Sequence, residues 1–336
     1  MESIYIIFYF ISSILFILGI KMLSSPTTAR RGNLISFIGM SLAVTTTLLI
    51  VDYNLDSIVF IFSGIFVGSI VGLIFAKKVQ MTSMPQMVAI FNGLGGLASS
   101  LIAFSEIIRS DTTISLNIIS ISILISILIG SVTFSGSITG FLKLQSLISG
   151  KPILLPLRNY LNFILLVSII CLMVASFFYN EQTLIFYILI GSCLLLGILI
   201  VLPIGGADMP VVIALLNSYS GIVAAFTGFI FSNIALIISG SLIGASGLIL
   251  TRIMTKAMNR SLANVILGGF GATKENSFDE ASDKSYKSGS SDDVASLLEY
   301  SENIIIVPGY GLAVAQAQHS IKAVSYTHLR AHETSI

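Results

Sequence analysis

The chain has 336 residues, of which 55% are hydrophobic and 10% are charged, and its formal net charge at pH 7 is +1. Soluble domains carry about 25% charged residues, so this composition argues against a soluble protein and for a membrane protein. The nearly balanced charge supplies no basic surface of the kind that nucleic-acid-binding proteins use. We therefore expect the lipid bilayer as a partner, and no nucleic acid.

The first residues, MESIYIIFYF, contain no basic segment, and no cleavage site with small residues follows them. We interpret them as the start of a retained membrane helix rather than a signal or transit peptide. The two cysteines, Cys171 and Cys193, lie singly in apolar runs, without a CxxC motif or a neighbouring histidine. We therefore expect neither a disulfide nor a metal site.

Apolar runs of about 20 residues are long enough to cross a bilayer as helices. The sequence contains nine such runs, and charged residues bound most of them. We therefore expect an all-α polytopic membrane bundle. Its spans are residues 3–20, 34–51, 57–76, 84–104, 118–142, 160–178, 184–202, 209–231 and 233–251.

The distribution of basic residues predicts how this bundle is oriented. Twelve Lys and Arg residues occur up to residue 260, and with nine spans eleven of them fall on one side. Only Arg109 falls on the other side. Because cytoplasmic loops carry the excess of Lys and Arg, we expect the N-terminus outside and the C-terminus in the cytoplasm.

Two spans carry glycines at helical spacing. Gly64, Gly68 and Gly72 repeat every four residues, and Gly240, Gly244 and Gly247 follow the same face of the last span. Such stripes let helix backbones approach closely in lipid. We expect them to serve helix packing rather than chemistry.

The composition changes after the ninth span, which ends the predicted transmembrane domain at residue 260. Residues 261–302 are polar and rich in Gly and Ser, as expected of a cytoplasmic hinge and linker. Within them, DDVASLLEY predicts a short helix. Residues 303–324 predict a short strand, a glycine turn at Gly309 and Gly311, and an Ala-rich helix. A helix that starts after such a turn can bind a phosphate, although a complete βαβ unit needs more chain than follows.

Asp208 is the only acid near a span on the predicted cytoplasmic side. It stands just before Pro210, which can occupy the first turn of a helix. Two roles are open at this point. Asp208 can cap the helix, or it can serve proton transfer or gating, because ionisable groups near the membrane interior are costly and usually functional.

Asn217 follows nine residues later, about 13 Å along a helix and close to the middle of the bilayer. An amide at this depth must find a partner or water. It either joins two helices by hydrogen bonds or marks a water-filled position on a proton or ion route. Ser218 and Tyr219 add hydroxyls that can relay protons.

The fourth span repeats this pattern. MPQMVAIFNGLGG at 84–96 aligns without gaps to MPVVIALLNSYSG at 209–221, an offset of 125 residues, and both contain an asparagine, Asn92 or Asn217. Both spans start on the same side, so we expect the two asparagines at the same depth. Internal repeats with a site in mid-membrane are typical of transporters. Between them, GSVTFSGSITG at 130–140 supplies small and hydroxyl residues to a lining helix.

Several long motifs resemble the β subunit of proton-translocating NAD(P) transhydrogenases. They are GGADMPVVIALLNSYSG, MTKAMNRSLANVILGGFG, IIIVPGYGLAVAQAQ, KKVQMTSMPQMVAIFNGLGGLAS, GSVTFSGS and GKPILLP, and the resemblance covers about residues 1–322. It implies a membrane domain that conducts protons and a Rossmann-like α/β domain, of which 303–324 would be the start, that binds NADP(H). It also implies a separate α subunit that binds NAD(H), and a dimer of αβ units.

The reaction implied is hydride transfer from NADH to NADP⁺, coupled to proton entry, in a bacterial plasma (inner) membrane. Carried over by motif, the proton pathway includes Asn92, Asp208, Asn217, Ser218 and Tyr219, and this chain holds no other catalytic residue. Lys256 and Arg260 fall in the hinge. The residues that match the start of the NADP(H) fingerprint are Gly309, Tyr310, Gly311, Ala313 and Val314.

Two departures from the family pattern stand out. Some members have a histidine where this chain has Asn92, and an amide cannot titrate near neutral pH, so Asp208, a bound water or the α subunit must hold the proton. The last residues, SYTHLRAHETSI at 325–336, do not resemble the family, and we expect them to be non-native. We expect the chain alone to be inactive, because most of the NADP(H) site lies beyond this sequence.

Two other functions fit part of the pattern. A secondary transporter or channel with a regulatory tail would need polar sites of substrate size in the bundle and no nucleotide. A pure anchor subunit would have no need of asparagines in mid-membrane. The scarcity of ionisable groups inside the spans suits protons and water better than a charged solute.

Overall fold

The structure is a computed structural model that describes residues 2–50, 54–80, 83–109, 117–178, 182–259, 261–266 and 291–301, with scattered positions between 304 and 323. The chain divides into two units, Met1–Ile266 and Leu267–Ile336. The first unit contains the long apolar helices and the candidate site. The short helix α10 (Leu262–Ile266) therefore belongs to the same unit as the bundle.

Nine helices in the described part of the chain are long and apolar enough to cross a membrane, which confirms the predicted number of spans. Each begins and ends within a few residues of the predicted bounds, apart from the longer ends of α2, α4 and α9. The helices are α1 (Glu2–Leu23), α2 (Ala29–Ile50), α3 (Leu55–Lys78), α4 (Met84–Arg109), α5 (Ile118–Leu144), α6 (Arg158–Ala175), α7 (Gln182–Val201), α8 (Met209–Ile230) and α9 (Ile234–Ala257).

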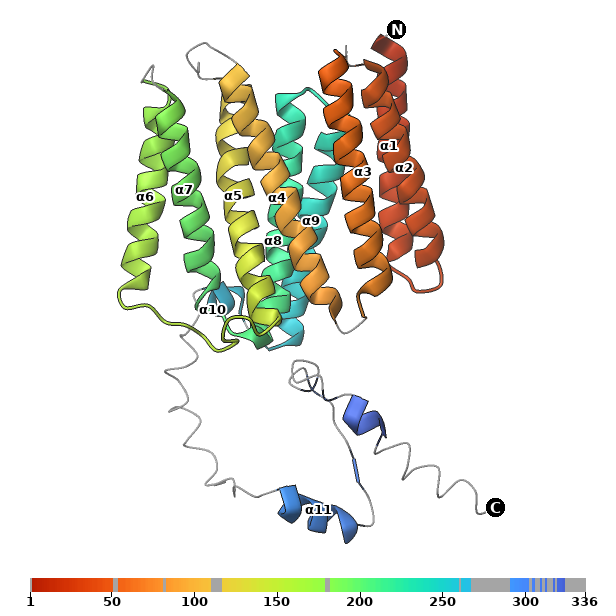
Figure 1. Ribbon diagram of the computed structural model, residues 1–336, viewed down its shortest axis with the longest axis vertical. Coiled ribbons are helices and arrows are strands. Elements are labelled where there is room, and N and C mark those ends of the chain that lie inside the picture. Colours follow the sequence, from red (N-terminus) through yellow and green to blue (C-terminus); the bar gives the residue numbers. More distant parts are fainter. Residues whose placement is uncertain are drawn as a thin grey trace. The chain divides into compact units, whose positions relative to one another are not determined.

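Three helices start with the same capping interaction. The side-chain oxygens of Asn54, Asn117 and Asn233 accept a hydrogen bond from the backbone N–H three residues further on, at 2.9, 2.8 and 3.1 Å. Each bond satisfies one of the amides that a helix start leaves unpaired. These caps define the first residues of α3, α5 and α9, which all begin at the upper end of the bundle in Figure 1.

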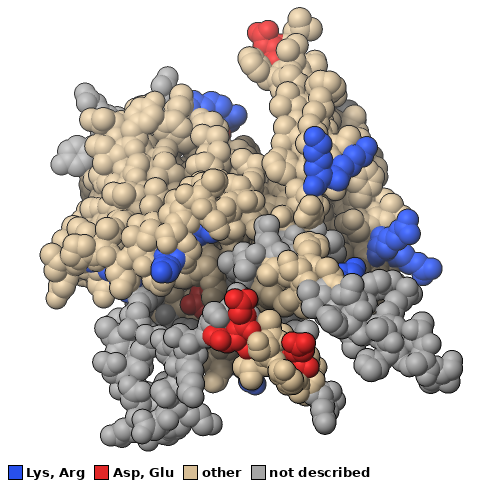
Figure 2. Space-filling view, turned by 60° about the horizontal axis from the view of Figure 1, so that its bottom comes forward, with Lys and Arg blue, Asp and Glu red and all other residues tan. Residues whose placement is uncertain are grey.

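Basic residues gather at the opposite end of the bundle. The last turns of α1, α3, α5 and α9 carry Lys21, Lys77 with Lys78, Lys143 and Lys256, in that order. Figure 2 turns this end forward and shows basic side chains distributed over it. We refer to it as the basic end. Cations at helix C-termini are favourable, because they face the negative end of the helix dipole.

Close helix pairs form where glycines meet. A Cβ atom at Gly96 of α4 would lie 2.8 Å from the carbonyl oxygen of Gly130 in α5. At Gly221 of α8, a Cβ atom would lie only 2.3 Å from the backbone nitrogen of Gly244 in α9. The α4–α5 and α8–α9 pairs are thus in backbone contact, and Gly96 and Gly221 occupy equivalent positions of the internal repeat. The packing predicted for the α9 glycine stripe is confirmed.

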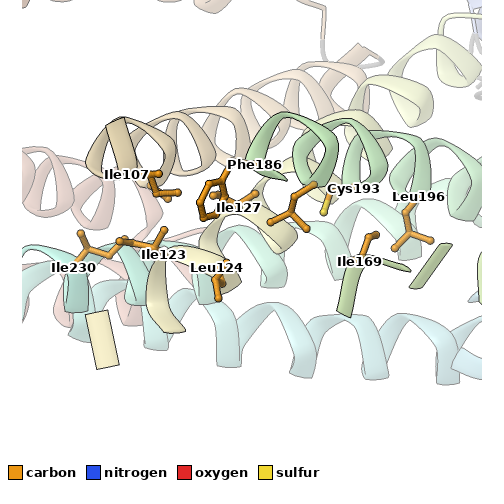
Figure 3. Close-up of a cluster of buried hydrophobic side chains, with 11 residues drawn as sticks. Ile107, Ile123, Leu124, Ile127, Ile169, Phe186, Cys193, Leu196 and Ile230 are labelled. Atoms are coloured by element: carbon orange, nitrogen blue, oxygen red, sulfur yellow. The ribbon is translucent and has the colours of Figure 1, made fainter. Parts of the chain in front are cut away.

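The apolar core of the bundle lies between α4, α5, α6, α7 and the end of α8. Figure 3 shows its side chains, among which Ile127, Ile169 and Phe186 are fully buried. This core holds α5 and α7 together beside the α4–α5 contact. It therefore fixes the position of α5, which carries much of the candidate site.

The helix α3 differs from the others because none of its residues is buried. Nothing lies within 4 Å of a Cβ atom built at Gly64, Gly68 or Gly72. The close packing predicted for this stripe is therefore not found among the described residues. The stripe faces away from the neighbouring helices of its own chain, and sequence alone cannot say which neighbour a stripe meets.

In the second unit, the short helix predicted from DDVASLLEY is present as α11 (Ser291–Glu299). The strand expected after residue 303 is not seen, because Ile304 and Ile305 lie outside any helix or strand. Residues 306–308 lie outside the described residues. A strand needs a hydrogen-bonded neighbour, and the described positions contain no second strand with which these residues could pair.

Candidate functional site

Asp208 stands at the start of α8, at the basic end of the bundle. The connection from α7 turns at Gly205 and forms a short 3₁₀ helix, Gly206–Asp208, before Met209 and Pro210 open α8. Asp208 has φ −90° and ψ −5° rather than the extended backbone of a capping residue, and its side chain does not cap the helix. The half-buried carboxylate is therefore placed at the mouth of α8 without serving as its cap.

Asn92 joins three helices near the middle of the bundle. It is 7% exposed, and its Nδ2 donates a hydrogen bond of 2.9 Å to Oγ of Ser137 in α5. Its Oδ1 accepts a hydrogen bond of 2.6 Å from Oγ of Ser220 in α8. The amide thus binds one donor and one acceptor from two other helices, which fixes its orientation.

A second pair of hydroxyls continues this polar contact along α4 and α5. Oγ of Ser100 and Oγ of Ser131 lie 2.9 Å apart in the buried interface. Thr133, which is also buried, packs its Cβ and methyl group against Gly96 between the two contacts, and its Oγ1 has no hydrogen-bond partner among the described residues. We call this group the polar seam; its residues are Asn92, Ser100, Ser131, Thr133, Ser137 and Ser220. It links α4, α5 and α8 in the interior of the bundle.

The consecutive residues that follow Asn217 in α8 have separate surroundings. The buried hydroxyl of Ser218 donates to the carbonyl oxygen of Gly244 in α9 at 2.6 Å. Tyr219 lines an apolar cavity on the side of α7 and α10. Ser220 reaches Asn92. Successive residues of a helix are about 100° apart, so this divergence is expected, and only Ser220 joins the polar seam.

Asn217 itself is half-buried and lies one turn closer to the basic end than Gly221, which contacts α9. The Oδ1 of Asn92 accepts its hydrogen bond from Ser220 and not from Asn217. The two asparagines of the repeat are therefore not a hydrogen-bonded pair. Asn217 stays a candidate for the proton route on the strength of its depth and residue type.

The sequence as a whole matches the family model described as NAD(P) transhydrogenase beta subunit over residues 5–336. The chain belongs to the NAD(P) transhydrogenase β-subunit family. Membership makes it a subunit of a membrane-bound oxidoreductase and decides against a secondary transporter with a regulatory tail. The family match extends into residues 325–336, the segment that we expected, from the sequence alone, to be non-native.

Individual relatives agree with this assignment. The NAD(P) transhydrogenase subunit beta of Rhodospirillum rubrum is 42% identical over 326 residues, which cover 94% of this chain and 69% of the relative. The corresponding sequence from a named strain of the same species gives the same figures.

The other residues suggested by the transhydrogenase resemblance are only partly described. Lys256 is exposed in the last turn of α9, whereas Arg260 lies outside the described residues. Gly309 is exposed, and its carbonyl oxygen accepts a hydrogen bond of 3.0 Å from the N–H of Leu312. The remaining fingerprint positions, Tyr310, Gly311, Ala313 and Val314, also lie outside the described residues.

Sequence reasoning about this transhydrogenase chain missed three polar residues. Ser220 and Ser137 were visible only as members of hydroxyl-rich stretches, and their pairing through Asn92 depends on three helices meeting. Lys143 was counted only as a basic residue in a loop. The structure shows it 2% exposed at the end of α5.

We expect Ser220→Ala to destabilise the transhydrogenase bundle by about 1–2 kcal/mol, because the buried Oδ1 of Asn92 loses its donor. Thermal unfolding of the purified complex in detergent measures the change. Ser246→Ala is the matched control, since this exposed hydroxyl bonds only to its own helix, at the carbonyl oxygen of Ile243. Equal transitions for the two variants would show that the Ser220 contact adds nothing to stability.

Proposed function

We propose that this chain provides the proton route of a proton-translocating NAD(P) transhydrogenase, with Asp208 at the cytoplasmic mouth and the polar seam in the interior. The observation that supports this best is the hydrogen-bonded contact of Asn92 with Ser137 and Ser220, which brings polar groups of three helices together in the interior of the bundle. Polar groups inside a membrane are costly and, besides joining helices, line ion and proton pathways.

Each part of the route has a distinct chemical role. Asp208 is the one described carboxylate at the basic end of the bundle, and it can take up and release a proton. Asn92 cannot titrate, but its amide orders the neighbouring hydroxyls, which both donate and accept hydrogen bonds. We infer that Asp208 exchanges protons with the cytoplasm while the seam, with water, carries them onward. Asn217 and Ser218 lie on α8 between Asp208 and Ser220, and so between the mouth and the seam along the helix.

The proposed orientation follows from charge. The basic end, which includes Lys77, Lys78 and Lys256, faces the cytoplasm, because positive loops are retained on that side. The N-terminus then lies outside, and the chain enters the cytoplasm after α9. We propose a bacterial inner membrane as the location, with 1–260 as the transmembrane domain, 261–302 as the hinge and linker, and 303–324 as the start of the NADP(H)-binding domain.

The nucleotide part of the proposal concerns the second unit and a partner. Gly309, Tyr310, Gly311, Ala313 and Val314 would approach the phosphates of NADP(H) as the start of a Rossmann-like domain. A separate α subunit would bind NAD(H), and two αβ units would pair. The transhydrogenase family membership supports this assignment, since hydride transfer between two nicotinamide nucleotides needs a site for each.

The short helix α10 is well placed to couple the two functions. Val265 is 1% exposed and packs with Val211 and Val212 of α8 in one apolar cluster. Together with Leu262 it borders a cavity of about 80 Å³, which Tyr219 also lines. The chain that follows α10 leads into the second unit. Movement of that chain would therefore displace Val265 and, through its contacts, the first residues of α8.

We expect Val265→Ala to weaken docking of α10 by about 1–2 kcal/mol, because two buried methyl groups are removed beside an existing cavity. Coupled hydride transfer should then fall, and limited proteolysis of the membrane-embedded complex should cut the segment after residue 260 faster. Ala263→Ser, at an exposed position of the same helix, is the control. Unchanged cutting and coupling in Val265→Ala would contradict the role of α10.

The proposed function is tested by NADH-driven reduction of NADP⁺ in vesicles that contain this β chain, with its complete nucleotide domain, and the α subunit. The rate should change when an uncoupler removes the proton gradient. Reduction that ignores the gradient, or no reduction by the assembled complex, would overturn the proposal.

A further inference from the structure

Lys143 is a buried cation at the basic end of the bundle, and the proton route described above does not use it. The residue is 2% exposed, and its Nζ donates to the carbonyl oxygens of Ile204, at 2.8 Å, and Lys151, at 3.3 Å. A third, short hydrogen bond runs to the carbonyl oxygen of Leu202. An ammonium group has three N–H donors, so every donor of Lys143 has an acceptor.

The three acceptors belong to two different connections of the chain. Leu202 and Ile204 lie between α7 and the turn that carries Asp208, whereas Lys151 lies between α5 and α6. The two connections also contact one another directly. The N–H of Gly206 donates to the carbonyl oxygen of Gly150 at 2.8 Å, and the N–H of Ile153 donates to that of Leu202 at 3.3 Å. Lys143 thus lies under a junction of two loops.

The position of this junction relates Lys143 to Asp208. Gly206, which the α5–α6 connection holds through Gly150, is the first residue of the 3₁₀ helix that ends at Asp208. The carbonyl of Ile204, held by Lys143, is only four residues before Asp208. A displacement of this segment would therefore move the carboxylate.

We propose that Lys143 is a positioning residue that fixes the Asp208 turn at the mouth of α8, by binding the carbonyl groups of both connections with its buried ammonium group. This role rests on the proposed proton function of Asp208. It assigns to Lys143 a task beyond that of a basic residue that orients the bundle, because an orienting charge needs no buried, fully bonded ammonium group.

The chemistry of the site explains why a cation is needed. The carbonyl of Leu202 follows directly on the last residue of α7, so it contributes to the negative end of that helix dipole. Removing the ammonium would take away the donor of the Ile204 carbonyl, in a residue that is 2% exposed, and would leave the Leu202 carbonyl with only the N–H of Ile153. Loss of a donor to a buried carbonyl disfavours the folded arrangement of the loops. The loops would separate to reach water, and Asp208 would lose its fixed position.

The test uses Lys143→Met, which keeps the length of the side chain and removes the donors, in the complete αβ complex in vesicles. Lys151→Met is the matched control, because the exposed Lys151 side chain belongs to the same junction but contributes only its backbone carbonyl. We expect Lys143→Met to lower coupled hydride transfer by roughly tenfold, since small displacements of a functional group have effects of this order or larger. Lys151→Met should stay within about twofold of wild type, as surface substitutions usually have little effect.

A disulfide between the two connections distinguishes a positioning role of Lys143 from other effects of its substitution. A Cβ atom at Gly206 would lie 3.8 Å from Cα of Gly150, and a Cβ atom at Gly150 meets nothing within 4 Å. Gly150→Cys with Gly206→Cys places one cysteine on each side of the junction, so the rate of disulfide formation reports how closely the two connections stay together. The pair should oxidise several times faster with Lys143 than with Lys143→Met. Oxidation of the pair in Lys143→Met should restore most of the coupled rate, and each single cysteine variant should show no restoration.

Three results would overturn the proposal. They are wild-type coupling and cross-linking in Lys143→Met, loss of coupling that the formed cross-link does not restore, and loss of membrane insertion in Lys143→Met with or without the cross-link. Failure of the proposed proton function has a different signature. In that case Asp208→Asn would leave coupling unchanged, while the rate of cross-linking would still report whether Lys143 holds the junction.

Discussion

Replacing Asp208 by Asn is expected to lower proton-coupled hydride transfer by about 10²-fold, the order of effect that loss of a proton-transferring side chain has. The substitution keeps the size of the side chain and its place at the start of α8, but the amide cannot take up a proton. The helix should remain intact, because the Asp208 side chain does not cap it. The measurement is the uncoupler-sensitive rate of NADPH formation in vesicles.

Asp56→Asn is the matched control for this experiment. Asp56 lies in the first turn of α3, which begins at the opposite end of the bundle from Asp208. Asp208→Glu, which keeps the carboxylate, should retain part of the coupled rate. Full coupling in Asp208→Asn, or an equal loss in Asp56→Asn, would mean that Asp208 has no special place on the proton route.

Replacing Gly221 by Val is expected to have the largest effect on stability, with destabilisation of at least about 3 kcal/mol, the upper end of ordinary overpacking. A Cβ atom at this position would come within 2.3 Å of the backbone nitrogen of Gly244 and 2.8 Å of its Cα. Backbone atoms in the middle of a helix cannot move aside as a side chain can. α8 and α9 must therefore separate along the segment that carries Ser218.

Thermal unfolding in detergent and coupled activity in vesicles measure the two consequences of Gly221→Val. The same substitution at Gly64 is the control, because nothing lies within 4 Å of a Cβ atom there and the loss of helical glycine is identical. Gly64→Val should keep both the transition temperature and the activity close to wild type. An equally stable Gly221→Val complex would show that the close α8–α9 contact is dispensable.

The helices were predictable because bilayer thickness sets their length. Nine apolar runs gave nine spans, and the N-terminus of α4 at Met84 and that of α8 at Met209 agree with the sequence to the residue. The alignment of 84–96 with 209–221 also anticipated that Gly96 and Gly221 are equivalent, and each lies at a close contact with the next helix. The length of a span, the start of a helix and the position of a glycine each depend on a short stretch of sequence, so they can be predicted from it.

Contacts between helices were not predictable in the same way. The motif NSYS predicts polar side chains close to the middle of the bilayer, but helical geometry directs Ser218 towards α9, Tyr219 towards a cavity and Ser220 to Asn92. Which of them meets a partner depends on how α4 and α8 cross. The glycines of α3 show the same limit, because their spacing fits close packing, yet nothing among the described residues lies within 4 Å of a Cβ atom built on them.

Lys143 is the most important residue that the sequence analysis missed, because its positive charge led us to expect it in solvent. Basic residues near span ends are expected in solvent, where they determine orientation. Only the fold of two connections over the end of α5 reveals that this lysine is buried and fully bonded. Asn92, which the sequence analysis singled out because an amide cannot titrate, orders hydroxyls of α5 and α8.

The most direct test of the central claim measures protons rather than nucleotides. Inverted vesicles that contain the complete αβ complex receive NADPH and NAD⁺, and a pH-sensitive dye reports acidification of their interior as hydride is transferred. The wild-type complex should acidify the interior, and Asp208→Asn should abolish this acidification in vesicles that contain the same amount of folded complex. Acidification by Asp208→Asn at the wild-type rate would contradict a proton route that starts at Asp208.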